Sequence, residues 1–254
     1  MIQEQRKKSI ADFFSFLVET VNELVNLRSN RHVSAQVIMR QILFTGVEAL
    51  PLIGFIALAI GGLTIMQGYA FLGTFGQGIW VHIILVRVVV SELSGIITAL
   101  VVIARSGTAI STELGNMVVN REMKLLRSFG ISPVGYLVVS RILGVMVAML
   151  VLTLYFNIIA VLGGWLFSQF FNHLEFRAFM NDFLALLTMP QLLMSILKSI
   201  VFGWIIALTA SFQGMSVSRA STEVPQRTIK AVVNSIFAVI ISDIALSWLF
   251  WMLS

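Results

Sequence analysis

The stretch from Ala104 to Tyr136, ARSGTAISTELGNMVVNREMKLLRSFGISPVGY, is a dense polar run in the middle of an otherwise very apolar chain. It lies between two long apolar segments. Its apolar residues recur at helical spacing, at Val119, Met123 and Leu126. Its polar residues gather on the other side of the same helix, at Asn120, Arg121, Lys124, Arg127 and Ser128. The pattern predicts a short amphipathic helix.

Glycine and proline mark the end of this helix. Gly130 is typical of the position just after a helix, and Pro133 reinforces the stop. A short basic helix between two membrane spans is expected to lie flat on the cytoplasmic surface. The alternative is a solvated loop that only follows the positive-inside rule, and periodicity alone leaves both interpretations open.

Composition predicts an integral membrane protein. Of the 254 residues, 58% are hydrophobic and 11% are charged, whereas a soluble domain carries roughly a quarter charged residues. The net charge is +5 and the basic residues cluster beside apolar segments, which favours membrane topology over a nucleic-acid partner. The chain has no cysteine, which excludes a disulfide and a thiolate metal site.

The N-terminal segment, residues 1–36, is predicted to hold an amphipathic helix at residues 10–28. We expect this helix to lie in the membrane interface, and the alternative is a soluble helix that packs on a partner. Its apolar residues share one face: Ile10, Phe13, Phe14, Leu17, Val21 and Leu24. Acidic residues interrupt the apolar run that a cleavable signal would need, at Asp12, Glu19 and Glu23.

Residues 37–254 are predicted to form an all-α transmembrane domain. Its five spans lie near residues 41–67, 82–103, 133–167, 191–215 and 231–253. Lys and Arg number six in residues 1–40, four in 104–136 and three in 216–230, against one in the opposite links 68–81 and 168–190. This asymmetry predicts a cytoplasmic N-terminus and a C-terminus outside.

Small residues recur every fourth position in two of the spans and in the central stretch. Such ladders let helix backbones approach closely in lipid. They occur at Ser91, Gly95 and Ala99, at Gly107, Ser111 and Gly115, and at Gly203, Ala207 and Ser211.

Ionisable groups inside the spans are the strongest chemical signal. Arg87, Glu92, Lys198 and Asp243 each cost several kcal/mol at the bilayer centre unless they are paired or hydrated. Two positive and two negative groups favour mutual pairing around an interior cavity. The pairs could serve only to fix helix packing. They could equally meet the phosphate or amine of a lipid headgroup, and the residues alone leave both interpretations open.

No enzyme pattern is present. The chain lacks G-x-x-x-x-G-K-[ST], G-x-S-x-G and H-E-x-x-H, so no catalytic residue is predicted. His32, His82 and His173 are isolated in the sequence, and we expect no metal site from them.

Several motifs together resemble the MlaE/YrbE permease family. They are Gln67-Gly68-Tyr69, Phe75-Gly76, Glu92-Leu93, Ala104-Arg105-Ser106-Gly107, Glu113-Leu114-Gly115-Asn116-Met117 and Gly130-Ile131-Ser132-Pro133. The resemblance covers roughly residues 37 to 250, and it is most specific between Glu92 and Pro133.

The resemblance implies the membrane subunit of an ABC transporter that moves lipid between the bacterial inner membrane and a periplasmic MCE assembly. Two copies would pair, and two separate ATPase subunits would bind ATP and Mg, so this chain itself would hold no cofactor. The lipid path would include Gln67, Phe71, Phe75, Arg87, Ser91, Glu92, Leu93, Lys198 and Asp243. A coupling helix at about 115–130 would contact the ATPase, together with the residues Glu113, Arg121, Glu122, Lys124, Leu126 and Arg127.

Two departures from the family pattern concern the substrate. Ser91 stands where the family has arginine, and Ser94-Gly95 stands where it has Gly-Pro. Arg87 lies one helical turn before Ser91 and is expected to supply the missing guanidinium. The family implies phospholipid in most systems and sterol-like or fatty lipids in others. The alternatives from other classes are a membrane scaffold that transports nothing and an ion-coupled secondary transporter.

Overall fold

The computed structural model describes residues 2–25, 35–72, 79–170, 175–218 and 220–253. Within these ranges the chain is helical and contains no strand. Five helical runs are long and apolar enough to cross a membrane: Gln36–Phe71, Trp80–Val119, Val134–Ser168, Met189–Met215 and Glu223–Met252. The predicted all-α membrane fold with five spans is therefore confirmed.

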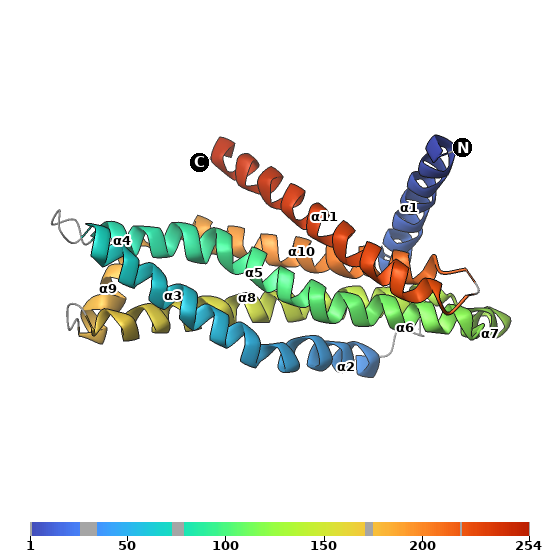
Figure 1. The fold of residues 1–254 in the computed structure, drawn as a ribbon, viewed down its shortest axis with the longest axis horizontal. Coiled ribbons are helices and arrows are strands. Elements are labelled where there is room, and N and C mark those ends of the chain that lie inside the picture. The colour runs from blue at the N-terminus through green and yellow to red at the C-terminus, as the bar shows by residue number, and fades with distance from the viewer. Residues whose placement is uncertain (1, 26–34, 73–78, 171–174, 219, 254) are drawn as a thin grey trace. The chain divides into compact units, whose positions relative to one another are not determined.

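Figure 1 labels the α-helices, and the η segments lie between them along the chain. The N-terminal helix is α1 (Ile2–Val25), and the first span is built from α2 (Ala35–Gly46), η2 (Val47–Ala49) and α3 (Leu50–Leu72). The second comprises α4 (Ile79–Ile84), η4 (Leu85–Leu93), α5 (Ser94–Val102), η5 (Ile103–Gly107) and α6 (Thr108–Val119). Then come α7 (Glu122–Ser128), η6 (Val134–Val138), α8 (Val139–Ser168), α9 (Phe176–Leu186), α10 (Met189–Met215) and α11 (Glu223–Leu253).

The helices form two compact units. The first unit contains Met1–Thr45, Val102–Val147 and Gly203–Val239. The second unit contains Gly46–Val101, Ala148–Phe202 and Ile240–Ser254. The predicted boundary between residues 36 and 37 stays a prediction.

In the first unit, small residues set the distance between helices. A Cβ on Gly115 would lie 3.1 Å from Val217 and 3.2 Å from Val224. A Cβ on Gly214 would lie 2.7 Å from the carbonyl oxygen of Ser111. The ladder of Gly107, Ser111 and Gly115 is thus a packing face, as small residues at every fourth position allow.

The N-terminal helix packs on this unit through aromatic rings. The ring of Phe13 lies 5.1 Å from that of Phe212 in an edge-to-face arrangement, and α1 also contacts η6. Phe14 on the same helix is 60% exposed. The predicted apolar face is therefore divided between a packed side and an open side.

In the second unit, α3 and α8 meet through their backbones. A Cβ on Gly61 would overlap the carbonyl oxygen of Ala160, and a Cβ on Gly163 would lie 2.6 Å from the carbonyl oxygen of Leu58. On another side of the unit, α9 packs against α4, where the rings of His82 and Phe179 lie 5.0 Å apart.

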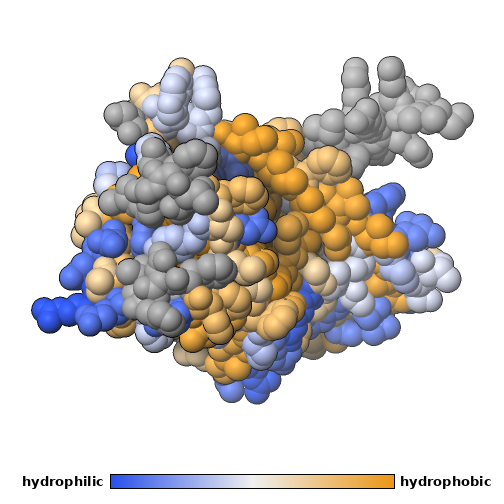
Figure 2. Space-filling view, turned by 60° about the vertical axis from the view of Figure 1, so that its left-hand side comes forward, coloured by the Kyte–Doolittle hydropathy of each residue, from blue (hydrophilic) through white to orange (hydrophobic). Residues whose placement is uncertain are grey.

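The surface carries broad apolar areas between polar patches, which Figure 2 shows in orange and blue. Exposed apolar side chains occur on several spans, among them Phe55, Ile158 and Phe237, which are 74%, 60% and 64% exposed. Lipid tails cover such side chains in a membrane protein, so this exposure agrees with the fold.

The structure corrects three predicted boundaries. The second span does not end near residue 103 but continues as helix to Val119, because the small residues of the polar stretch pack inside the first unit. The N-terminal helix begins at Ile2, eight residues before the predicted start, and is described to Val25, while residues 26–28 of the predicted helix lie outside the described residues. The link 168–190, predicted as a loop, contains α9, whose Phe179 and Phe183 are buried.

Candidate functional site

Three of the four ionisable groups predicted inside the spans meet in the second unit. Glu92 comes from η4, Lys198 from α10 and Asp243 from α11. We call these three residues the charge triad. Ser247, one helical turn after Asp243 on α11, lies beside them.

The ammonium of Lys198 is the centre of the triad. Its Nζ lies 2.5 Å from Oε2 of Glu92 and 2.8 Å from Oδ1 of Asp243. It also donates a hydrogen bond of 2.7 Å to Oγ of Ser247, which in turn donates to Oε2 of Glu92 at 3.2 Å. The contact with Asp243 is an ion pair without hydrogen-bond geometry. Three oxygens therefore lie within 2.8 Å of Nζ, and two of them accept its hydrogen bonds.

Burial divides the triad into a closed end and an open end. The side chain of Lys198 is 1% exposed and that of Asp243 is 12% exposed, whereas that of Glu92 is 42% exposed. One ammonium faces two carboxylates, and the carboxylate of Glu92 is the more exposed of the two. Such a group can attract the ammonium of a ligand, and it can also be a hydrated packing device.

The backbone around Glu92 is not a regular α-helix. Residues Leu85–Leu93 form a π-helical segment, and Oγ of Ser91 donates a 3.0 Å hydrogen bond to the carbonyl of Val86, five residues earlier. Such segments occur often at functional sites. Ser91 and Leu93 are half-buried, and neither joins the ion pairs of the triad.

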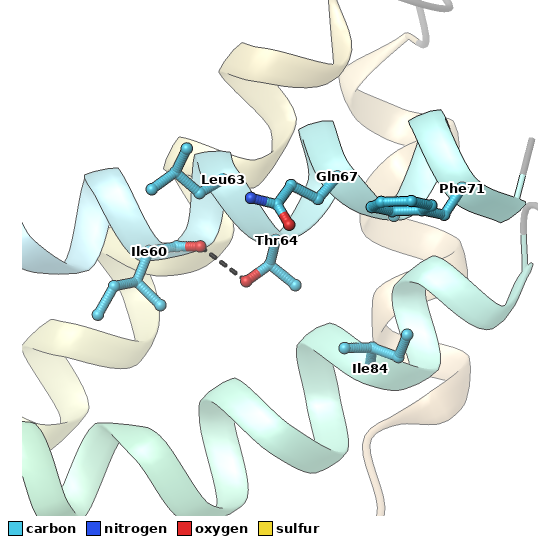
Figure 3. Close-up of a pocket in the computed structure, with 7 residues that line it drawn as sticks. Ile60, Leu63, Thr64, Gln67, Phe71 and Ile84 are labelled. Atoms are coloured by element: carbon cyan, nitrogen blue, oxygen red, sulfur yellow. Dashed lines mark hydrogen bonds between the residues drawn. The ribbon is translucent and has the colours of Figure 1, made fainter.

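A largely apolar cavity of about 540 Å³ lies at the end of the first span, and we call it the first-span cavity. Figure 3 shows Leu63, Gln67 and Phe71 along α3, with Ile84 across from them on α4. The hydroxyl of Thr64 is satisfied within α3, because it donates a 2.7 Å hydrogen bond to the carbonyl of Ile60. Gln67 is thus the main polar group that the cavity can offer a ligand.

The structure brings only part of the predicted lipid path together. Gln67 and Phe71 line the first-span cavity, and Glu92, Lys198 and Asp243 form the triad. Phe75 lies outside the described residues. Arg87 lines a different cavity and makes no ion pair within the described ranges, so the expectation that it joins the other charges is wrong.

Ser247 beside the triad and Thr64 in the first-span cavity were not among the predicted residues. Ser247 follows Asp243 by four residues, and Thr64 precedes Gln67 by three. Both spacings place the second residue on the same helix face as the first, so a search at i±3 and i±4 around each predicted residue would have found them.

The predicted amphipathic helix of the central stretch exists as α7, with sharp ends. Arg121 has a φ of 63°, which breaks the helix between α6 and α7. At the other end, Gly130 has a φ of 74° and donates to the carbonyl of Arg127, while Ile131 donates to that of Leu126. This hydrogen-bond pair is a Schellman motif, so Gly130 ends the helix as predicted.

The basic residues of α7 border a cavity in the first unit. Its volume is about 340 Å³, and its cations are Arg121, Lys124 and Arg127. Met123 anchors the helix with 8% exposure, while Leu125 and Phe129 are 57% and 71% exposed. An exposed apolar pair beside three cations suits a protein partner with acidic groups.

The other two predicted coupling residues with charge have internal partners. Oε2 of Glu113 lies 2.9 Å from a guanidinium nitrogen of Arg141, and the Glu113 side chain remains 62% exposed. Oε1 of Glu122 accepts a 3.3 Å hydrogen bond from the amide of Asn120. Glu113 therefore joins the second span to the third within the first unit and lies on α6, not on α7. Leu126 is half-buried.

Metal-binding side chains do not cluster in the part of the chain that the structure describes. No group of three or more His, Cys, Asp or Glu in those ranges is placed to hold a metal ion.

The chain is similar to several known proteins, among them proteins named as transporter permeases. The chain is 27% identical over 206 residues to a probable ABC transporter permease protein of Rickettsia typhi, covering 81% of this chain and 80% of the relative. It is 31% identical over 160 residues to the Arabidopsis thaliana protein TRIGALACTOSYLDIACYLGLYCEROL 1, chloroplastic, covering 63% of this chain and 46% of the relative. It is 24% identical over 211 residues to the intermembrane phospholipid transport system permease protein MlaE of Haemophilus influenzae, covering 83% and 81%.

The family model described as Permease MlaE matches residues 38–249. These residues include all five membrane-spanning runs almost completely. The chain is a multi-pass membrane protein with the features of an ABC transporter permease subunit, and it belongs to the MlaE permease family.

Proposed function

We propose that this permease moves a phospholipid or a related lipid between the bacterial inner membrane and a periplasmic MCE protein, and so maintains the lipid composition of the outer membrane. The observation that carries the proposal is the charge triad, which leaves one carboxylate open beside a buried ammonium at membrane depth. A headgroup is both charged and hydrated, so it can lie beside the Glu92 carboxylate and keep it solvated. An acyl chain in the same place would remove water from the carboxylate and offer no polar group in return.

The first-span cavity supports the same proposal. It is apolar enough for acyl chains, with Gln67 as its polar group. Ile84 of this cavity and Glu92 of the triad lie on one helical run, eight residues or about 12 Å apart. A lipid with its headgroup near one feature could place its glycerol or acyl region near the other.

Separate subunits would supply the energy. An ABC permease works with ATPases, and we propose two of them bound at α7, with ATP and Mg held by them and none by this chain. The Lys and Arg counts support a cytoplasmic N-terminus and a periplasmic C-terminus. A second copy of the chain would cover α11, where Phe237, Ile241, Ile244 and Trp248 are 57–65% exposed.

Reconstitution tests the function directly. The protein, its ATPase and its MCE partner are placed in proteoliposomes, and transfer of labelled lipid to or from the MCE protein is measured with and without ATP. Transfer that needs ATP supports the proposal. Transfer without any ATPase would indicate a secondary transporter, and an intact complex with neither transfer nor lipid-stimulated ATP hydrolysis would indicate a scaffold.

Replacing Glu122 and Arg127 with alanine should abolish ATPase binding or uncouple ATP hydrolysis from lipid. Both side chains lie on α7, and an interfacial arginine often contributes about 2 kcal/mol or more to binding, about thirtyfold in affinity. Co-purification of the ATPase and its lipid-stimulated turnover are the measurements. Arg177→Ala, at an exposed arginine on α9, is the control and should behave as wild type. A double variant with normal binding and turnover would remove α7 from the coupling role.

Cysteine labelling should place α1 in the membrane interface. The chain has no cysteine of its own, so Phe14→Cys and Glu19→Cys each give a single reactive thiol. Both positions are exposed in the structure. A lipid-facing Phe14→Cys should react with a membrane-impermeant maleimide at least tenfold more slowly than Glu19→Cys. The labelling rates of the two variants in detergent, where both thiols are accessible, serve as the reference. Equal labelling rates of the two variants in vesicles would contradict an interfacial helix.

A further inference from the structure

A second cavity in the second unit is not used by the function proposed above, and we call it the arginine cavity. It has a volume of about 250 Å³ and lies between the start of the second span and the segment that joins α9 to α10. Its polar lining comes from Arg87, Thr188 and Gln191. Its apolar lining comes from Trp80, Ile83, Val86 and Leu186. No carboxylate is among these lining residues.

Among the described residues, no carboxylate neutralises Arg87. It forms no ion pair with any described residue, and its side chain is exposed. It lies seven residues, or about 10 Å, inside a membrane-spanning run that begins at Trp80. An unpaired guanidinium at that depth needs water or an anion. Trp80 is half exposed, as tryptophans at the membrane interface often are, so lipid phosphates are within reach of a long arginine side chain.

The rest of the polar lining, the Thr188 hydroxyl and the Gln191 amide, can donate hydrogen bonds to a ligand. The backbone N–H of Thr188 donates a 3.1 Å hydrogen bond to Oε1 of Gln191, which uses one of the two acceptor sites of that oxygen. The two N–H groups of the Gln191 amide point to a donor role toward a ligand, and the Thr188 hydroxyl adds a further possible donor. The N-terminus of α10, a helix of 27 residues, adds partial positive charge at the same place. The arginine cavity thus combines a full positive charge, amide donors and an apolar wall.

We propose that the arginine cavity binds a phosphate ester, as a headgroup site separate from the charge triad. An arginine binds two phosphate oxygens at once, and Ile83 and Leu186 would contact the glycerol and first methylenes of a lipid. The same phosphate chemistry would hold a free phosphate ion. The inference rests on the proposed function only in taking the ligand to be a lipid, since the site itself needs no transport.

Binding of phosphatidylglycerol to the purified, delipidated full-length protein tests the site, with native mass spectrometry as the readout. Arg87→Gln should weaken this binding about ten- to hundredfold, as expected when a hydrogen-bonded charge is lost. Arg87→Lys should retain part of it. Arg177→Gln, which removes an exposed arginine of α9 outside the cavity, should bind as wild type does. A galactolipid with the same acyl chains and no phosphate should bind all four proteins equally weakly.

The competing outcomes are distinct. Displacement of the lipid by millimolar inorganic phosphate would identify a plain phosphate site, and persistence of the lipid would identify a lipid site. Equal phosphatidylglycerol affinity in wild type and Arg87→Gln would overturn the proposal whether or not the protein transfers lipid. Arg87-dependent binding in a protein that transfers no lipid would keep the site and refute the transport function.

Discussion

Lys198→Met should slow lipid transfer about a hundredfold and lower the thermal stability of the protein. Methionine fills a similar volume, but it leaves Glu92 and Asp243 without the ammonium that now lies 2.5 and 2.8 Å from their carboxylates. Removing one partner from a buried ion pair costs about 3–5 kcal/mol. The hundredfold slower transfer corresponds to about 3 kcal/mol of lost headgroup interaction. Transfer in proteoliposomes and the melting temperature of the same preparation are the measurements.

A triple variant separates function from stability in this experiment. With Lys198→Met, Glu92→Met and Asp243→Leu combined, no unpaired charge remains, so stability should return to near the wild-type value. Transfer should stay low, because the headgroup has lost its polar partners. Glu92→Gln alone should fold normally and transfer slowly, since Glu92 is the exposed end of the triad. Normal transfer by both Glu92→Gln and Lys198→Met would leave the triad with a packing role only.

Gly61→Val should prevent the protein from folding in the membrane. Any Cβ at this position would overlap the carbonyl oxygen of Ala160 and lie 2.8 Å from its Cα, so α3 and α8 would have to separate. Overpacking against side chains costs about 1–3 kcal/mol, and the cost here is larger because backbone atoms cannot rotate away. Expression, monodispersity in detergent and the melting temperature report the effect.

Gly46→Ala is the matched control for the glycine variant. Gly46 belongs to the same unit as Gly61 and also faces α8. A Cβ on Gly46 would meet only the Cβ of Ala148, at 4.0 Å. This alanine should be tolerated, and alanine also favours helix over glycine by about 1 kcal/mol. A stable, well-folded Gly61→Val protein would show that α3 and α8 do not need their close contact.

Hydropathy predicted the five spans because each helical run must keep apolar side chains toward lipid. The end of α7 at Gly130 was also predictable, since a left-handed residue at this position favours glycine. Glu92, Lys198 and Asp243 were expected to pair because none of them is stable alone at membrane depth. The spans, the helix end and the paired charges could be predicted because each follows from the residue types themselves and from the membrane environment.

Other features depended on tertiary contacts that no local pattern contains. The polar residues from 104 to 119 read as a surface link, yet Ser106 and Ser111 are buried where small side chains pack against neighbouring helices. The environment of Arg87 depends on α9, whose buried Phe179 and Phe183 were read as part of a loop. Its separation from the triad could therefore not be predicted from the second span alone.

The π-helical segments at Leu85–Leu93, Ile103–Gly107 and Val134–Val138 have a consequence for comparing this chain with its relatives. Each such segment places one extra residue within a helical turn, so the angular phase of all later residues shifts by about 100°. A helical wheel drawn straight through the second span would assign residues before and after Glu92 to wrong faces. With a one-residue gap at these points, an alignment can match interior-facing residues of this chain to interior-facing residues of a relative. Without the gap, the alignment can match interior-facing residues to lipid-facing ones.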